Sequence, residues 1–223
     1  MDDGSTPTQA QPQAGSRRKQ GRPSEAERRV IDERVIDAAF AIFSAQGFDA
    51  ARMDKVAVAA GVTKMSLYRR FPGKGELLAA VIKRQSAQLH TDIPTPEPVT
   101  DPVAAIKALM WAYRERISAD RMLALQRLAL TAVQEDAVRQ ALADVRAHYV
   151  APVDMLVDIA KANGALPPMP TEELREILFD LLVNDAASLP LHGYPSVDNQ
   201  RRIFIQRWDV LREGLLRDGT SES

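Results

Sequence analysis

The chain has 223 residues, of which 45% are hydrophobic and 26% charged, enough to bury one large core or two modest ones. It contains no cysteine, so disulfides, thiolate metal sites and a cysteine nucleophile are excluded. The sequence shows neither an apolar signal segment near its start nor a run of about eighteen apolar residues, so it predicts a cytoplasmic protein without membrane contact.

The formal net charge of −1 conceals an uneven distribution of charge along the chain. Residues 1–90 carry 15 Lys and Arg against 10 Asp and Glu, whereas residues 91–223 carry 14 against 20. Such an asymmetry is typical of a phosphate-binding module joined to a domain that does not bind phosphate, although a solvated surface also produces it.

Helical periodicity dominates, and almost no stretch alternates apolar and polar residues as a strand would, so we expect an all-α protein. Residues 1–23 are predicted to be a disordered basic arm. Ser24 is the expected N-cap of the first helix and Gly47 its C-terminal stop. The helices expected in this part of the chain cover residues 24–46, 53–60, 64–70 and 75–89.

Four prolines between residues 91 and 102 cannot continue a helix, so this segment is predicted to connect two units. We therefore expect a compact module over residues 24–90, a larger helical domain over 91–217 and a tail over 218–223. The later helices are expected at 102–118, 120–133, 136–162 with a kink at Pro152, 171–189 and 196–217, with Thr171 and Ser196 as N-caps.

The segment 53–71 has the pattern of a helix, a turn and a second helix. Gly61 tolerates the positive φ that such a turn requires, and Thr63 is a suitable N-cap for the second helix. Leu67 and Phe71 are expected to face inward. The first helix has an apolar face at spacings of three and four, formed by Met53, Val56, Ala57 and Ala60.

This segment and its surroundings resemble the TetR family of transcriptional regulators. The likeness covers roughly residues 30–80, whereas the later helices fit the family only in number and length. The residues that carry the resemblance are Gly47-Phe48, Val56-Ala57, Ala60-Gly61-Val62, Tyr68, Phe71-Pro72, Lys74 and Leu77-Leu78.

The resemblance implies that the second helix enters the major groove of double-stranded operator DNA. Phosphate contacts would set the register of the protein, and base contacts would set its sequence preference. The implied phosphate contacts are Thr63, Tyr68 and Lys74. The implied base contacts are Lys64, Met65, Ser66 and Arg69.

Two positions depart from the family pattern. Ala51-Arg52 stands where a pair of hydroxyl residues usually caps the helix 53–60, and loss of that cap is expected to cost about 1 kcal/mol. Arg52 is instead a candidate for a direct phosphate contact. Gly75 stands where a better helix former is common.

The basic arm carries Arg18 and Arg22 directly before the module. A flexible basic segment in this place is expected to enter a minor groove beside the second helix. The alternative is a solvated linker.

The resemblance also implies that the C-terminal domain binds a small-molecule effector, whose identity is unknown, and dimerises through its last two long helices. The alternative for both sets of residues is an ordinary intramolecular core. The candidate effector contacts are Met110, Trp111, Met122, Gln126, Tyr149, Met155 and Asn184. The candidate dimer contacts are Leu178, Leu181, Leu182, Phe204, Trp208 and Leu211.

Together these features predict a sequence-specific DNA-binding regulator, a ligand-released repressor that acts as a homodimer on a palindromic operator. One alternative keeps DNA binding but gives the C-terminal half only a role in dimerisation or protein interaction. An enzyme is a remote alternative. The three histidines, His90, His148 and His192, are far apart in the sequence, and no catalytic motif is present. No cofactor or metal is expected.

Overall fold

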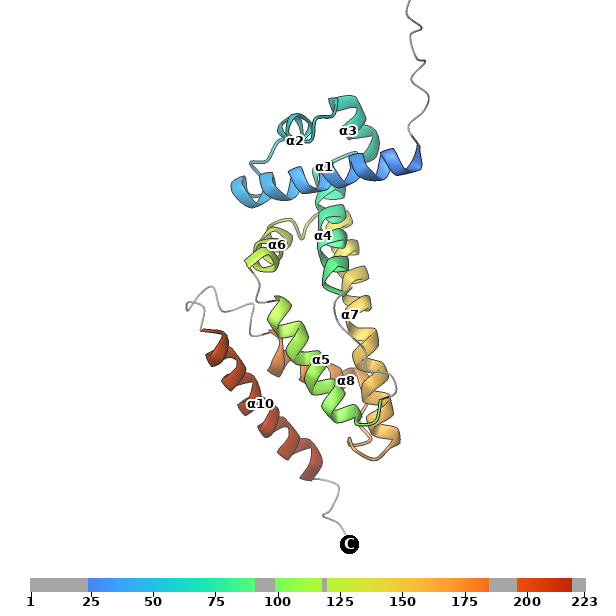
Figure 1. Cartoon of the computed structure of the whole chain (residues 1–223), viewed down its shortest axis with the longest axis vertical. Coiled ribbons are helices and arrows are strands. Elements are labelled where there is room, and N and C mark those ends of the chain that lie inside the picture. Colours follow the sequence, from blue (N-terminus) through green and yellow to red (C-terminus); the bar gives the residue numbers. More distant parts are fainter. Residues whose placement is uncertain (1–23, 91–98, 118–119, 185–195, 218–223) are drawn as a thin grey trace, which may run out of the picture.

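The computed structural model describes residues 24–90, 99–117, 120–184 and 196–217. Over these residues the chain forms helices and no strand, which confirms the all-α prediction (Figure 1). The helices are α1 (Glu25–Gln46), α2 (Met53–Ala60), α3 (Lys64–Arg70), α4 (Lys74–His90), α5 (Pro102–Ile117), α6 (Asp120–Thr131), α7 (Asp136–Ala162), α8 (Thr171–Leu182) and α10 (Val197–Arg217).

The predicted caps are largely confirmed. At the start of α1 a capping box forms, because the Ser24 side chain accepts from the Glu27 backbone N–H and the Glu27 carboxylate accepts from the Ser24 N–H. The prediction of Thr171 as an N-cap is wrong, since Thr171 is the first helical residue of α8 and the N-cap is Pro170. The confirmed caps are Ser24, Gly47, Thr63 and Ser196.

The helix predicted over 171–189 is shorter than expected, because α8 ends at Leu182. Two guanidinium groups hold this end: Arg114 of α5 donates to the Leu182 carbonyl at 3.0 Å, and Arg207 of α10 donates to the Leu181 carbonyl at 3.0 Å. Cationic donors satisfy the unpaired carbonyls of a helix C-terminus and complement its dipole. The other helix bounds lie within two residues of the prediction.

The N-terminal helices do not close a core by themselves. α1 lies across the top of the molecule with α2 and α3 above it, and α4 descends from it beside α7 (Figure 1). We call the shared core of α1 to α4, α6 and the first half of α7 the upper core. Its members from α6 to α7 are Met122, Leu125, Leu128, Ala129, Ala132, Val138 and Ala141. The predicted boundary after residue 90 therefore separates helices that share one core.

Two close contacts join α6 and α7 to the N-terminal helices. Gly75 permits the first, since a Cβ at this position would lie 2.7 Å from Glu135 Oε2 and 3.3 Å from Glu135 Cβ. In the second, Arg121 of α6 lies 4.7 Å from the centre of the Phe40 ring of α1 and donates to Gln85 Oε1 of α4 at 2.6 Å. Glycine at position 75 thus allows the α6–α7 turn to approach α4.

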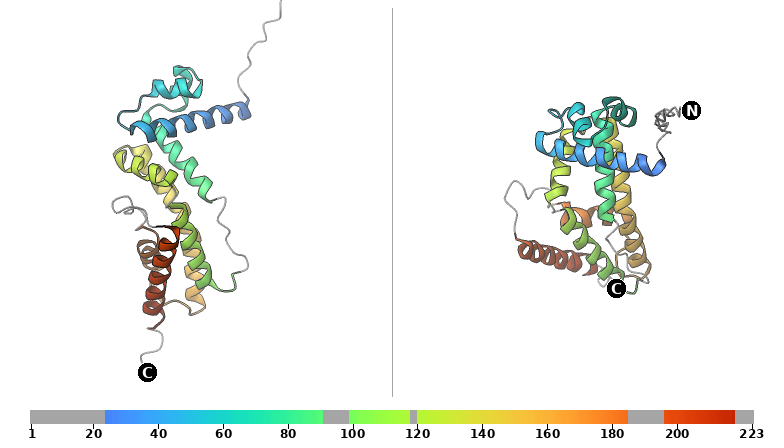
Figure 2. Two further views of the ribbon diagram at one scale, coloured as in Figure 1. Left: turned by 60° about the vertical axis from the view of Figure 1, so that its left-hand side comes forward. Right: turned by 45° about the horizontal axis from the view of Figure 1, so that its top comes forward.

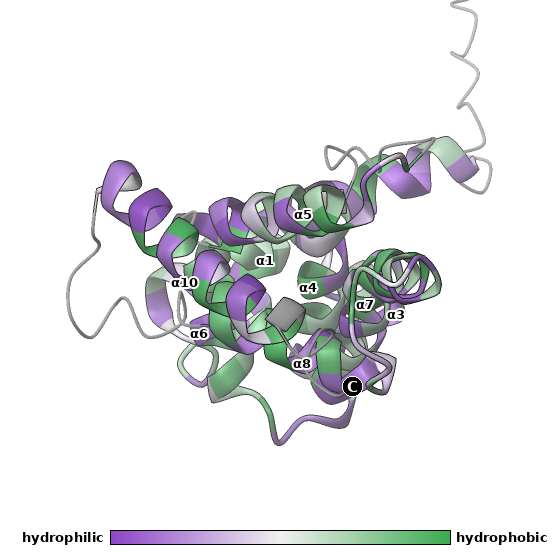
Figure 3. Cartoon of the chain, turned by 90° about the horizontal axis from the view of Figure 1, so that it is seen from below, coloured by the Kyte–Doolittle hydropathy of each residue, from purple (hydrophilic) through white to green (hydrophobic). Residues whose placement is uncertain are grey.

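A second core, the lower core, is formed by α5, the second half of α7, α8 and α10. Tyr113 lies at its centre, with its ring 5.2 Å from that of Tyr149 and 6.0 Å from that of Phe179. α10 carries hydrophobic and hydrophilic residues along its length (Figure 3), as expected of a helix that buries one face. Since α7 contributes to both cores, it ties the top of the molecule to its base (Figure 2).

Candidate nucleic-acid interface

The turn between α2 and α3 has the geometry that the sequence predicts. Gly61 adopts φ 63° and ψ 38°, in the left-handed region, and the Val62 N–H donates to the Ala57 carbonyl at 2.9 Å. This pair forms a glycine C-cap of the Schellman type, which turns the chain sharply after α2. The apolar face of α2 is buried, so α2 and the turn fix the position at which α3 begins.

One face of α3 is buried against the rest of the module, and the opposite face is exposed to solvent. Leu67 is fully buried and Phe71 nearly so, while the Thr63 hydroxyl accepts from the Ser66 N–H at 3.1 Å and caps the helix. Met65 is 80% exposed, although it is a large apolar side chain. The other exposed side chains of α3 are Lys64, Tyr68 and Arg69. The outward face of α3 is therefore free to meet a partner.

An unpredicted arginine holds α3 against α1. Arg70 is only 13% exposed, and its Nε donates to Asp32 of α1 at 2.6 Å. Its Nη1 donates to the Ser66 hydroxyl at 2.6 Å and to the Ser66 carbonyl at 3.2 Å. Ser66, a predicted base contact, is thus engaged within α3. The spacing of four residues places Ser66 and Arg70 on the same face of α3, and this was the sequence signal for the contact between them.

The ammonium group of Lys64 is paired within the module. It lies 2.9 Å from Asp54 of α2, and both side chains are at least half exposed. The pairing raises the pKa of Lys64 above its ordinary value, mainly through the hydrogen bond to Asp54. A surface pair of this kind is weak, so Lys64 can exchange Asp54 for another anion.

Lys74 is also engaged within the protein. Its Nζ donates to the Phe48 carbonyl at 3.0 Å and to the Asp49 carbonyl at 2.9 Å, and it lies 4.9 Å from the centre of the Phe48 ring. These contacts fasten the start of α4 to the loop after α1. The third ammonium hydrogen is the one left for a phosphate.

The N-terminal end of α2 has the weakness that the sequence predicts. Arg52 occupies the N-cap position, and its side chain makes no capping hydrogen bond. Arg52 is exposed, as a phosphate contact requires. Arg18 and Arg22 lie outside the described residues.

The family model for "Bacterial regulatory proteins, tetR family" matches residues 35–81, which run from the middle of α1 through α3 into α4. Over these residues the chain is similar to the tetR family of bacterial regulatory proteins. Among curated relatives, the uncharacterized HTH-type transcriptional regulator TtgW of Pseudomonas putida is 41% identical over 76 residues. The HTH-type transcriptional regulator SrpR, also of Pseudomonas putida, is likewise 41% identical over 76 residues.

These sequence matches cover 34% of this chain, 56% of TtgW and 35% of SrpR, so the sequence likeness does not extend over whole proteins. The likeness in fold extends further. The flavonoid-responsive regulator FrrA has a TM-score of 0.68 at 21% identity and covers 82% of this chain and 95% of its own. GusR of Salmonella enterica has a TM-score of 0.65 at 19% identity and covers 87% of this chain and 98% of its own.

Three of the seven candidate effector contacts share a cavity. Met122, Gln126 and Tyr149 line a space of about 330 Å³ between α4, α6 and α7. The other lining residues, which sequence reasoning missed, are Ile82, Ser86, Ile117, Leu125, Ala129, Leu130, Val133, Leu142 and Val145. The lining residues of α6 recur at spacings of three and four, which indicates that they share one face of the helix. This spacing does not indicate which other helices that face meets.

The other four candidate effector contacts lie elsewhere. Met110 is fully buried in the lower core, and the Trp111 ring packs edge-on against Phe204 at 5.1 Å. Met155 is exposed on α7. Asn184 is exposed and donates to Asp180 Oδ1 at 2.7 Å. None of the four lines the 330 Å³ cavity.

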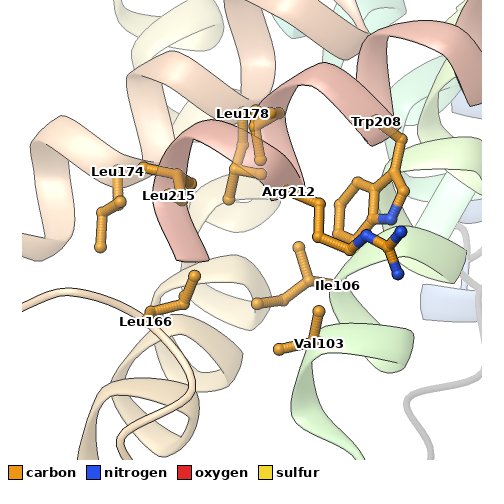
Figure 4. A pocket seen from close by; sticks show the side chains of 9 residues that line it. Val103, Ile106, Leu166, Leu174, Leu178, Trp208, Arg212 and Leu215 are labelled. Atoms are coloured by element: carbon orange, nitrogen blue, oxygen red, sulfur yellow. The ribbon is translucent and has the colours of Figure 1, made fainter. Parts of the chain in front are cut away.

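Five of the six candidate dimer contacts are buried within the chain itself. They are Leu178, Leu182, Phe204, Trp208 and Leu211, whereas Leu181 is 43% exposed. Leu178 and Trp208 face a gap of only about 20 Å³, room for about one water molecule (Figure 4). Among the described side chains of α8 and α10, the exposed large apolar ones are Leu181, Ile205 and Val210.

Within the described ranges, no helix is long and apolar enough to cross a membrane. The same residues contain no group of three or more His, Cys, Asp or Glu arranged to hold a metal ion.

Proposed function

We propose that this protein is a sequence-specific DNA-binding repressor that acts as a homodimer on a palindromic operator and is released by a small-molecule effector. The observation that carries the proposal is the exposed face of α3 on a rigid support. Leu67 and Arg70 fix α3 from below and from the side, while Met65 and Arg69 point away from the module.

The exposed residues of α3 suit the edges of bases in a major groove. The guanidinium of Arg69 can donate two hydrogen bonds to guanine or contact a phosphate, and the Met65 side chain can cover a thymine methyl group. Lys64 reaches the DNA by leaving Asp54, because a phosphate or base acceptor replaces the carboxylate. Ser66 contributes through the hydrogen of its hydroxyl, since its oxygen already accepts from Arg70.

Phosphate contacts position this helix. Thr63 precedes α3, Tyr68 lies on α3 and Lys74 begins α4. Arg52 is exposed at the start of α2. In this proposal Lys74 orders the loop after α1 and offers one hydrogen to a phosphate. The predicted arm adds Arg18 and Arg22 in the minor groove.

A dimer is proposed because a palindrome requires two copies of α3 about 34–36 Å apart, one turn of the duplex. α8 and α10 are the proposed contact helices, through the exposed residues Leu181, Ile205 and Val210 in place of the five predicted residues that the chain buries internally. An operator-bound dimer blocks polymerase without a further contact, which favours repression over activation.

Release by an effector is supported by the position of the cavity. Its wall includes Ile82 and Ser86 of α4, the helix that directly follows the helix-turn-helix. A molecule that favours one position of α4 shifts the spacing of the two copies of α3, and equal affinity for both positions would shift nothing. The cavity thus favours a sensor over a C-terminal half used only for dimerisation.

Selection of bound duplexes from random-sequence DNA, followed by fluorescence anisotropy across a salt series, tests the proposal. We expect a palindromic consensus, and we expect Arg69→Ala to weaken binding to that consensus more than binding to random duplex, because Arg69 is a proposed base contact. Arg127→Ala is the matched control, because Arg127 is exposed on α6 away from α3. Equal losses in both variants, or no consensus, would contradict the proposal.

A further inference from the structure

The 330 Å³ cavity is lined mainly by α4, α6 and α7, with Ile117 from the end of α5 and Val133 from the α6–α7 turn. α4 contributes Ile82 and Ser86, α6 contributes most of one wall, and α7 closes the far side with Leu142, Val145 and Tyr149. α4 and α6 also belong to the upper core, which includes the buried faces of α1 to α3. A molecule in this cavity therefore touches the same packing unit that supports α3.

The lining of the cavity has no side chain that is charged at neutral pH. Nine of the twelve lining residues are apolar, and the remaining three are Ser86, Gln126 and Tyr149. Burial raises the pKa of Tyr149 to about 12, so its phenol stays neutral. An ion that entered would lose hydration without gaining a counter-charge, which is costly.

The nearest charged groups do not alter this conclusion. Lys83 and Asp144 line an adjoining hollow, which shares Ser86 and Val145 with the cavity, and they pair with each other at 2.7 Å. Their pairing holds the pKa of Asp144 below its ordinary value. Arg116 of α5 acts on the Tyr149 phenol electrostatically but does not line the cavity.

The volume of the cavity, which is open to solvent at the exposed Leu130, indicates the size of a molecule that fits inside it. An apolar cavity of about 150 Å³ accommodates one benzene ring. The cavity here is about 330 Å³, which corresponds to a molecule of two rings. Pockets of this size that bind small molecules combine apolar walls with a few polar groups that fix orientation.

Gln126 is the polar group best placed for that role. The Ser86 hydroxyl already hydrogen-bonds the Tyr149 phenol. Within the part of the chain that the structure describes, no hydrogen bond occupies the Gln126 amide. Its carboxamide offers a donor and an acceptor on the α6 wall.

We propose that the cavity between α4, α6 and α7 binds an uncharged, largely apolar molecule of about two rings, with one hydrogen-bonding group directed at Gln126. The proposal names the chemical class of the effector and rests on the proposed function for its regulatory consequence. Binding itself does not depend on DNA and is measured without it.

The test uses two naphthalene fluorophores and the full-length chain. The uncharged ketone prodan is expected to bind saturably, one per chain, with a blue shift, and anionic 1-anilinonaphthalene-8-sulfonate at least tenfold more weakly. Ala129→Phe fills the cavity and should weaken prodan binding at least tenfold. Ala143→Phe is the matched control, because Ala143 is an exposed residue of α7.

Two further variants keep the test decisive if Ala129→Phe fails to fold. Gln126→Leu retains the volume and should weaken prodan binding about threefold to tenfold, since one hydrogen bond is lost. Leu130→Arg adds a cation at the rim, where Leu130 is 74% exposed, and should reverse the preference toward the sulfonate. Preferential binding of the sulfonate to the parent protein, or prodan binding unaffected by every cavity variant, would overturn the proposal.

Operator release is then measured separately by anisotropy. Release by prodan in the parent protein but not in Gln126→Leu at the same concentration would support both proposals. Prodan binding that depends on Gln126 without any change in DNA affinity would uphold the site and overturn effector release.

Discussion

Replacing Lys74 with methionine separates a structural role of this lysine from a role in DNA contact. Methionine keeps the aliphatic stem but removes the ammonium group that donates to the Phe48 and Asp49 carbonyls at 3.0 and 2.9 Å. Hydrogen bonds from a charged donor contribute roughly 1.5–3 kcal/mol each when buried, and the cation over the Phe48 ring adds about 0.5–1 kcal/mol. Because the Asp49 contact is exposed, we expect a total loss of about 2 kcal/mol.

Chemical denaturation followed by circular dichroism measures this loss as a lower midpoint at unchanged slope. In a thermal scan it corresponds to a decrease in Tm of roughly 4–8 °C. Lys55→Met is the matched control, because Lys55 is exposed on α2 and its ammonium group, among the described residues, hydrogen-bonds only the Gln46 side chain, at 3.1 Å. Its effect should stay below about 0.5 kcal/mol. If Lys74→Met changes stability no more than this control, the structural role of Lys74 is refuted.

Four further outcomes follow from the structure. Gly61→Ala should destabilise the protein by about 1–2 kcal/mol in the same denaturation assay, because alanine is strained at a φ of 63°. No atom lies within 4 Å of the added Cβ, so this backbone strain is the whole effect, and an unchanged midpoint would contradict it. Met65→Ala should leave stability unchanged but weaken specific DNA binding about tenfold in anisotropy, with no effect on random duplex. Asp54→Asn should raise DNA affinity about twofold to fivefold at low salt by freeing Lys64, and a loss of affinity would refute the exchange. Burial favours the neutral phenol of Tyr149 and raises its pKa to about 12, so its contribution to stability is complete below about pH 10 and is lost as pH rises through 12; tyrosinate absorbance should reveal this delayed titration.

The helix-turn-helix could be predicted in detail because its determinants are local. The capping box at Ser24, the positive φ at Gly61 and the cap at Thr63 depend on residues within five positions along the chain. The inward orientation of Leu67 and Phe71 follows from helical periodicity. Local signals therefore suffice for the module that carries the exposed face of α3.

The long-range contacts could not be predicted in this way. The periodicity of α6 indicates an apolar face but not that this face joins the upper core and one wall of a cavity. The apolar positions of α8 and α10 fitted either an interface or an intramolecular core, and Phe204 and Trp208 are buried within the chain. The end of α8 depends on Arg114 and Arg207, which are distant in sequence.

The sequence also could not indicate which polar side chains are already bonded within the protein. A lysine at position 74 fitted a phosphate contact from sequence, yet its ammonium group satisfies two backbone carbonyls. The link that Arg70 makes from α3 to Asp32 of α1 spans 38 positions of the chain and has no local signal. Only the folded arrangement shows which charged groups are occupied.

Hydroxyl-radical footprinting on the selected duplex tests most directly the central claim that two copies of α3 enter successive major grooves. The account predicts two protected patches on one face of the duplex, about 10 base pairs apart from centre to centre. Both patches should disappear with Arg69→Ala and remain with Arg127→Ala. A single patch, or continuous protection that does not depend on Arg69, would contradict the account.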